Sequence, residues 1–113
     1  MLDDVWELHA RRILDSRGQY TIETKLVTPR GFFLASVPHG ASKGSFEAKE
    51  LPSVAAVQNV NFRIAPYFLK KPLSGQTEFD KQLIALDGTP KKTRLGANAL
   101  LSVSMAACRA NAL

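Results

Sequence analysis

The sequence predicts an α+β fold in which helices pack on one face of a small antiparallel sheet. Three strand-like segments occupy residues 5–37, helical spacing follows Pro52, and turn-forming residues separate the segments. The chain has 113 residues, of which 45% are hydrophobic and 22% charged. We therefore expect one globular domain over residues 1–113 rather than a two-domain enzyme.

The first third of the chain is expected to form a three-stranded meander. Residues 5–14 tolerate extended geometry, and the turn-forming sequence Asp15-Ser16-Arg17-Gly18 follows them. Residues 20–28 alternate, with one face made of Tyr20, Ile22, Thr24 and Leu26 and the other of Thr21, Glu23, Lys25 and Val27. Pro29-Arg30-Gly31 breaks this strand, and residues 32–37 are a third short apolar run. Short connections between successive strands favour antiparallel pairing.

Loop chemistry over residues 38–45 separates the strands from the helices. After Pro52 the spacing of the residues predicts one helix face, made of Val54, Val57, Asn61 and Ile64. Ser53 is expected to cap this helix, and Pro66 to stop or restart it.

Two further helices are predicted. Ser74 is expected to cap a helix over residues 75–86, which has an apolar stripe of Phe79, Leu83 and Leu86. Asp87-Gly88 should end that helix. The last helix begins near Gly96, with apolar residues at Leu100, Val103, Met105, Ala107 and Cys108.

The net charge of +5 lies entirely in the second half of the chain. Residues 1–57 carry seven bases and seven acids, whereas residues 58–113 carry eight bases and three acids. A basic half is compatible with nucleic acid, an acidic partner or an anionic substrate. Lys70-Lys71 and Lys91-Lys92 are expected to be solubilising residues on exposed helix faces, because no aromatic residues interleave them. Nucleic-acid binding is therefore the least favoured of the three.

The single cysteine, Cys108, excludes an internal disulfide and is expected to be a small buried residue. No apolar run approaches the roughly 18 residues of a membrane span. Met1 is followed by Asp3, Asp4 and Glu7, where a secretory signal would be basic. We expect no membrane association and a cytoplasmic location.

One segment, Gly40-Ala41-Ser42-Lys43-Gly44, has residues that suit a phosphate or an oxygen-bound cation: backbone N–H groups, a hydroxyl and an ammonium. Its spacing fits neither the P-loop nor the dinucleotide fingerprint, and short Gly/Ser loops are more often plain connectors. Asp15-Ser16-Arg17-Gly18 is equally ambiguous, because Asp and Ser at a turn usually bond to their own backbone.

Taken together and in order, the motifs of this chain resemble enolase, the phosphopyruvate hydratase of glycolysis. The matching segments are residues 12–18 with 21–23, residues 37–44 with 47–51, residues 59–61 with 64–66, residues 86–89, and residues 95–104. Each segment is short, but five in the family's order across nearly the whole chain are specific.

The resemblance implies a capping domain, a three-stranded meander followed by helices, that packs on a larger barrel. In the family, the loop matching Gly40, Ala41 and Ser42 closes over 2-phosphoglycerate. The serine matching Ser42 ligates the second Mg²⁺ through its hydroxyl and carbonyl oxygens. Lys43 and Gly44 belong to the same substrate loop. The arginine matching Arg17 lies near the mouth of the site, and we carry it over only as an electrostatic contributor.

Several residues depart from the family pattern. Gln19-Tyr20 replaces an Asn-Pro pair, His39 replaces a small residue, and Lys43 replaces a threonine. A stretch of polar and glycine residues that normally follows Glu-Leu is missing after Leu51. The sequence given also stops within what the family continues as a helix, which suggests a split gene product, an excised domain or a relic.

The resemblance places no catalytic residue on this chain, because the family's base, acid and first-metal ligands lie on the barrel. Glu47 and Glu50 match positions that the family does not use as acid or base, and we expect exposed or locally paired carboxylates there. His39 is expected to be a loop surface residue. The leading hypothesis is therefore the lid domain of an enolase, which converts 2-phosphoglycerate to phosphoenolpyruvate, and which is inactive until a barrel domain completes it.

A different class of function stays open: a non-catalytic, enolase-like protein-interaction module. For a lid that lacks its barrel we expect an exposed apolar patch on some face of the helices or at the loop end of the sheet, or else its burial in a homo-oligomer. We also expect residues 40–44 to be mobile in the absence of ligand and metal.

Overall fold

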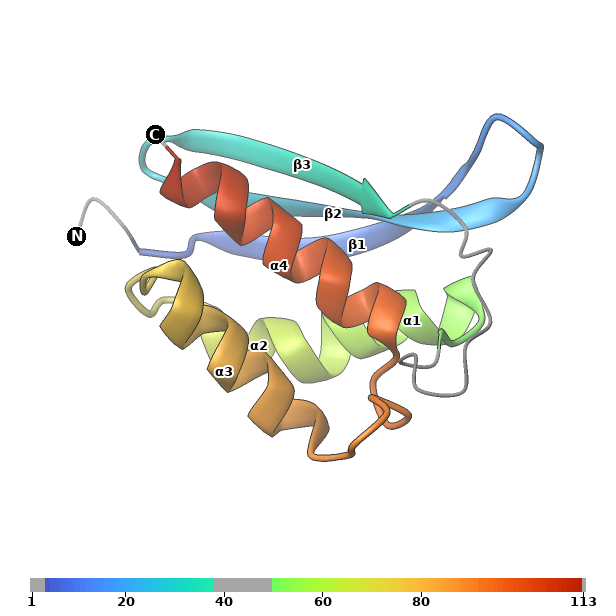
Figure 1. Cartoon of the computed structure of the whole chain (residues 1–113). Coiled ribbons are helices and arrows are strands. Elements are labelled where there is room, and N and C mark those ends of the chain that lie inside the picture. The colour runs from blue at the N-terminus through green and yellow to red at the C-terminus, as the bar shows by residue number, and fades with distance from the viewer. Residues whose placement is uncertain (1–3, 38–49, 113) are drawn as a thin grey trace.

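The structure is a computed structural model and describes residues 4–37 and 50–112. A three-stranded sheet forms one layer, and the helices cover one of its faces (Figure 1). The elements in chain order are β1 (Glu7–Leu14), β2 (Tyr20–Thr28), β3 (Gly31–Val37), α1 (Ser53–Asn59), the π-helical turn η1 (Val60–Ile64), α2 (Ala65–Phe68), α3 (Gln76–Asp87) and α4 (Ala97–Asn111). The predicted α+β class and the antiparallel meander are confirmed.

The sheet has the order β1-β2-β3 with antiparallel pairing throughout. Arg11 lies opposite Glu23 in one ladder, and Ile22 lies opposite Val37 in the other. Successive side chains alternate between the two faces, so Ile22, Thr24 and Leu26 are buried under the helices. The other face, which we call the open sheet face, carries His9, Arg11, Glu23, Lys25, Phe32 and Leu34.

The long helix α4 packs against β2 and β3, while α1 and η1 cover β1 and α3 packs against α4 (Figure 1). One buried polar contact joins the layers: the hydroxyls of Thr24 and Ser102 lie 2.7 Å apart. The residues around this contact are small, including Ala99, Ala106 and Ala107. Small side chains allow the helix to lie close to the sheet.

The first predicted helix is confirmed in position but wrong in its details. The chain from Ser53 to Phe68 is divided into α1, η1 and α2, and Pro66 lies in the first turn of α2. Ser53 lies inside α1, and Pro52 at the N-cap makes no side-chain capping bond. Val54 is 50% exposed, because the buried residues are Ala56, Val60 and Ile64, which are four residues apart.

The π turn brings one side chain to the edge of the sheet. The Asn61 amide accepts a hydrogen bond from the Ala10 N–H at 2.7 Å and donates one to the Ala10 carbonyl at 3.1 Å. The edge strand of a sheet leaves backbone N–H and carbonyl groups without a strand partner. Here the Asn61 side chain bonds both backbone groups of Ala10. The sequence predicted Asn61 on a helix face from its spacing alone, and it did not predict this contact with the sheet edge.

The second and third helices agree with the predictions except at their starts. Gly75, not Ser74, occupies the N-cap of α3 and offers no side chain for capping. Phe79 and Leu83 are buried as expected, and Gly88 ends the helix with a positive φ of 72°. Cys108 is exposed rather than buried, because α4 turns only its other side toward the sheet.

The lysine pairs do not lie on helix faces as predicted but in the turns that follow α2 and α3. The Lys71 ammonium lies 3.9 Å from the centroid of the Tyr67 ring, so one aromatic residue does accompany that pair. The backbone at this turn also pairs with the start of the chain, where the Val5 N–H donates to Lys71 and the Val5 carbonyl accepts from Lys70. Among the helices of the described residues, none is long and apolar enough to cross a membrane.

Candidate functional site

Most of the predicted site falls within residues 38–49. Gly40, Ala41, Ser42, Lys43 and Gly44 lie outside the described residues, as do His39 and Glu47, so the expected mobility of that segment stays a prediction. The structure does describe Arg17 and the two stems that border the segment, which end at Val37 and resume at Glu50.

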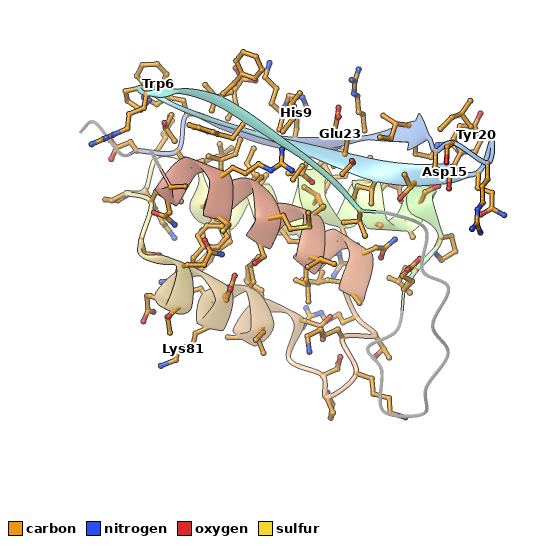
Figure 2. All side chains as sticks on the ribbon, turned by 45° about the horizontal axis from the view of Figure 1, so that its top comes forward. Trp6, His9, Asp15, Tyr20, Glu23 and Lys81 are labelled. Atoms are coloured by element: carbon orange, nitrogen blue, oxygen red, sulfur yellow. The ribbon has the colours of Figure 1, made fainter. Side chains whose placement is uncertain are left out.

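Arg17 lies at the tip of the β1–β2 turn, where its side chain is exposed. The Asp15 carboxylate accepts hydrogen bonds from the backbone N–H groups of Arg17 and Gln19, each at 2.9 Å. Gly18 has a φ of 76°, a left-handed conformation that glycine adopts without strain. The Asp15 turn therefore fixes the backbone at the end of the molecule where Figure 2 labels Asp15, and it leaves the Arg17 side chain exposed.

The residue after Gln19 extends this end of the sheet. Tyr20 is exposed, and the Arg12 guanidinium carbon lies 4.1 Å from the centroid of its ring. This contact is a cation–π interaction between neighbouring strands. The Gln19-Tyr20 sequence thus gives the turn an aromatic surface.

The first stem, at the end of β3, is held by a side chain of β2. The Thr21 hydroxyl donates a hydrogen bond to the Val37 carbonyl, and Val37 itself is buried opposite Ile22. The strand is therefore fixed up to the last residue before the undescribed segment.

The second stem is held by the first turn of α4. The Asn98 amide donates to the Leu51 carbonyl at 2.9 Å and accepts from the Leu51 N–H at 3.2 Å. Gly96 lies directly beneath, with a φ of 98°, and a Cβ there would stand 2.9 Å from Asn98 Oδ1 and 3.0 Å from Leu51 Cγ. Only glycine fits both the conformation and the space. We call Asn98, Gly96 and Leu51 the stem clamp.

A buried carboxylate holds the segment that leads into the stem clamp. Asp87 is fully buried and accepts hydrogen bonds from the Leu95 N–H at 2.7 Å and from the N–H and hydroxyl of Thr89. Asn59 donates from the other side to the Leu95 carbonyl at 3.0 Å. Residues 88–95 are therefore tied to both α3 and α1.

Burial alone would raise the pKa of the Asp87 carboxyl, because it disfavours the charged form. The hydrogen bonds from the Thr89 hydroxyl and from the backbone N–H groups of Leu95, Thr89 and Arg94 outweigh that effect and hold the pKa below its ordinary value. Asp87 is thus a structural carboxylate that stays ionised, not a proton donor.

Sequence reasoning gave Asp87 a role only in ending a helix, and it assigned no site role to Asn98, Asn59 or Thr21. All four lie in the motifs that carried the resemblance, so the motifs themselves were the available signal. Their partners are backbone groups up to 47 residues away in sequence, and no spacing rule predicts such contacts.

The described residues offer little acid–base or metal chemistry at this end of the molecule. No group of three His, Cys, Asp or Glu side chains suited to a metal ion occurs in residues 4–37 and 50–112. Glu23 is paired with Arg11 and His9 lies 3.7 Å from Glu7, both on the open sheet face. What this end supplies is a positively charged turn and two fixed stems.

The amino-acid sequence matches a known family. The family model for the N-terminal domain of enolase matches residues 5–113. This chain belongs to the enolase N-terminal domain family. It is also similar to Enolase 1 of Entamoeba histolytica, with 46% identity over 119 aligned residues that cover 96% of this chain. The chain spans 27% of the length of that relative.

Two of the motifs that resemble the family contain residues that hold the stems. The motif over residues 95–104 includes Gly96 and Asn98 of the stem clamp, and the motif over residues 86–89 includes Asp87 and Thr89. Two of the five motifs, residues 86–89 and 95–104, therefore contain side chains that hold Leu51 and the segment from Thr89 to Leu95 in place.

The open sheet face carries exposed aromatic side chains, whereas the apolar patch expected on a helix face or at the loop end of the sheet stays a prediction. Phe32 and Trp6 are exposed there, and Figure 2 shows Trp6 at the far end from Tyr20. A shallow cavity of about 240 Å³ lies beside Phe32, lined also by His9, Arg11, Glu23, Lys25 and Leu34. Helices cover only the other face of the sheet, so this surface is available to a partner.

Proposed function

We propose that this enolase N-terminal domain is the capping part of an enolase site, which dehydrates 2-phosphoglycerate to phosphoenolpyruvate once a barrel domain completes it. One observation supports this most directly. Val37, held by Thr21, and Leu51, held by Asn98, anchor both ends of residues 38–49 at the same end of the molecule as the Arg17 turn (Figure 1). Anchored stems are what a loop needs to meet a separate domain in a defined position.

The chemistry requires the barrel. Removing the C2 proton of 2-phosphoglycerate needs a base, an acid for the departing hydroxide and metal to neutralise the carboxylate. We propose Ser42 as the one Mg²⁺ ligand of this chain, and its two oxygens are fewer than the six that Mg²⁺ requires. We propose that Arg17 attracts the anionic substrate electrostatically and that residues 40–44 close over it. A cytoplasmic location goes with this glycolytic role.

The first experiment measures phosphoenolpyruvate formation by the 113-residue chain with excess Mg²⁺. We expect no turnover. Turnover that disappears in Ser42→Ala would contradict the proposal, because it would show a complete site on these residues.

The second experiment supplies a barrel: the part of the Entamoeba histolytica relative that lies outside the match. We expect binding and measurable activity in the mixture, and Ser42→Ala should raise the Mg²⁺ requirement and slow turnover. Ser36→Ala, an exposed serine on β3, is the matched control and should change neither. Lys43→Thr should tighten Mg²⁺, because it removes a like charge beside the metal. A looser Mg²⁺ in that variant would mean that Lys43 contacts the phosphate.

A second candidate function is the non-catalytic interaction module. The exposed Arg12–Tyr20 pair favours it, since this aromatic surface stands where the family has Asn-Pro. A barrel that binds the chain without gaining activity, and a Ser42→Ala variant that behaves like the unsubstituted chain, would support this function. The open sheet face is the proposed contact of a homo-oligomer, and a concentration-dependent mass that falls in Phe32→Ser would support that arrangement.

A further inference from the structure

A groove runs between α3 and α4, on the side of the helical layer away from the sheet. It has a volume of about 320 Å³, and its floor is formed by Leu83 and Leu100, which are buried. Ile84 on α3 and Leu101 on α4 form its walls and are 50% and 49% exposed. Two large apolar side chains from neighbouring helices thus border one apolar depression.

The polar groups at the groove differ in whether they have partners. The Asp80 carboxylate accepts hydrogen bonds from the Ser104 hydroxyl at 2.6 Å and from the Gln76 amide at 3.0 Å. Lys92 also lines the groove and is half-buried. The ion pairs formed within residues 4–37 and 50–112 join Glu7 to His9 and Arg11 to Glu23, all on the sheet, so neither neutralises Lys92.

The backbone holds Lys92 in this position. Its φ is 58°, a left-handed conformation that a non-glycine residue adopts at some energetic cost. The Lys92 N–H donates to the Thr89 carbonyl and the Lys92 carbonyl accepts from the Gly96 N–H, so the turn tied down by Asp87 fixes it. The Lys92 backbone is therefore fixed at the edge of the groove.

We propose that the α3–α4 groove binds an acidic segment of a partner protein, one that places leucine-type side chains over Leu83 and Leu100 and a glutamate or aspartate against Lys92. Apolar side chains bordering a groove between two helices suit an amphipathic segment. Lys92 is a half-buried residue with no ion-pair partner among the described residues, and it lies in the basic half of the chain, so an acidic segment is favoured.

Charge argues against a second copy of this chain as the occupant. Residues 58–113 carry eight bases and three acids. Two of those acids, Asp80 and Asp87, are already engaged by hydrogen bonds within the chain. Two copies meeting through this face would bring their basic turns together, which is unfavourable. The inference goes beyond the capping function and does not depend on it.

The test uses the full 113-residue chain with a fluorophore on Cys108, its single cysteine. Cys108 is exposed and follows Ser104 by one helical turn, so a label there lies beside the groove. The probes are two synthetic helical peptides that share a leucine face: one has glutamates flanking that face, where they can reach Lys92, and the other has glutamines at the same positions. We expect the glutamate peptide to bind about three- to tenfold more tightly.

Variants assign the binding to the groove. Lys92→Gln should abolish the preference for glutamate, whereas Lys91→Gln, its exposed neighbour, should keep it. Leu101→Ser should weaken both peptides by at least about fivefold. Val54→Ser is the matched control, because Val54 is exposed to the same degree on α1. Circular dichroism melting of each variant verifies that it is folded.

Four results would overturn the proposal. Equal affinity for the two peptides, or a glutamate preference that survives Lys92→Gln, would remove the acidic partner. Binding that is unchanged in Leu101→Ser would place the peptides elsewhere. A homodimer that dissociates in Leu101→Ser would show that a second copy occupies the groove. Loss of enolase reconstitution alone would leave this inference intact, since its readout is peptide binding.

Discussion

The middle of the helical layer and the end that carries the loop stems are held by different forces. In the middle, Phe79 stacks on Phe68 with ring centroids 4.4 Å apart, and Leu83 packs nearby among buried residues. At the stem end, Asp87 and Asn98 hold backbone groups through hydrogen bonds. One region gains stability from apolar burial and the other from directional contacts.

This difference separates stability from position. Apolar burial scales with area and is tolerant of direction, so it keeps the domain folded without specifying where one backbone group lies. Hydrogen bonds contribute less net free energy but fail when a donor or acceptor moves. The stem end therefore has the contacts that a functional loop requires, and substitutions in the two regions should have different consequences.

The largest effect is expected in the apolar middle. Phe79 is 1% exposed, so Phe79→Ala should lower the free energy of unfolding by about 3–5 kcal/mol, through lost burial and the cavity left behind. Urea denaturation measures this change. Phe62→Ala is the control, because Phe62 is 75% exposed and its loss should cost less than about 0.5 kcal/mol. Equal effects would mean that Phe79 does not lie in the core.

Asp87→Asn should lower the free energy of unfolding by about 1–3 kcal/mol. The Asp87 carboxylate accepts hydrogen bonds from the N–H groups of Thr89 and Leu95, whereas the amide of asparagine would turn an NH₂ group toward one of these donors. The pKa of Asp87 is lowered in the folded chain. Its contribution to stability is therefore complete above the unfolded-state pKa of about 4 and is lost as the pH falls through the still lower folded value.

Urea midpoints measured as the pH is lowered from 7 to about 2 test this dependence. The acid loss of stability should be smaller in Asp87→Asn than in the unsubstituted chain. Identical pH profiles would show that Asp87 contributes nothing to the loss of stability at low pH.

Asn98→Ala should act locally on the stem clamp. It removes both hydrogen bonds to Leu51 and should cost about 1–2 kcal/mol. Amide exchange of Leu51 should accelerate more than that of core residues such as Val103. Asn111→Ala, at the other end of α4, removes exposed bonds and is the matched control. Protection of Leu51 that is unchanged in Asn98→Ala would mean that another group holds the stem.

The smallest effect is expected on the open sheet face. Arg11 donates to Glu23 across the strands at 2.9 and 3.0 Å, but its side chain is largely exposed. Arg11→Gln should cost about 0.2–1 kcal/mol, and less in high salt. A loss that persists in 1 M salt would mean that the guanidinium stabilises the sheet by packing rather than by charge.

Some sequence predictions failed for reasons that can be named. Ser53 and Ser74 have the chemistry of N-caps, yet Pro52 and Gly75 take those positions. Packing decides where the first helical residue lies, and the side-chain propensity is small by comparison. Val54 was expected to be buried, but the π turn at Val60–Ile64 shifts the face that meets β1. A pattern read at 3.6 residues per turn contains no sign of that extra residue.

The sequence by itself determined the strands, the order of the elements and the family. Alternation over residues 20–28, the Asp15 turn and Gly88 as a helix end depend on local backbone and side-chain chemistry, and each is present as predicted. The enolase family could likewise be identified from the order of the motifs alone. The strand, the turn and the helix end each depend on interactions within a few residues of the chain, which is the range over which local sequence rules apply.

Only the tertiary structure decided which side chains hold the site and which are exposed. Asn98 meets Leu51, Asn61 meets Ala10, and Asp87 collects donors from Thr89 and Leu95 because the fold closes around them. Cys108 and Leu101 are exposed because α3 and the sheet cover other sides of α4. Contacts of this kind join residues distant in sequence, and their existence depends on how the layers pack.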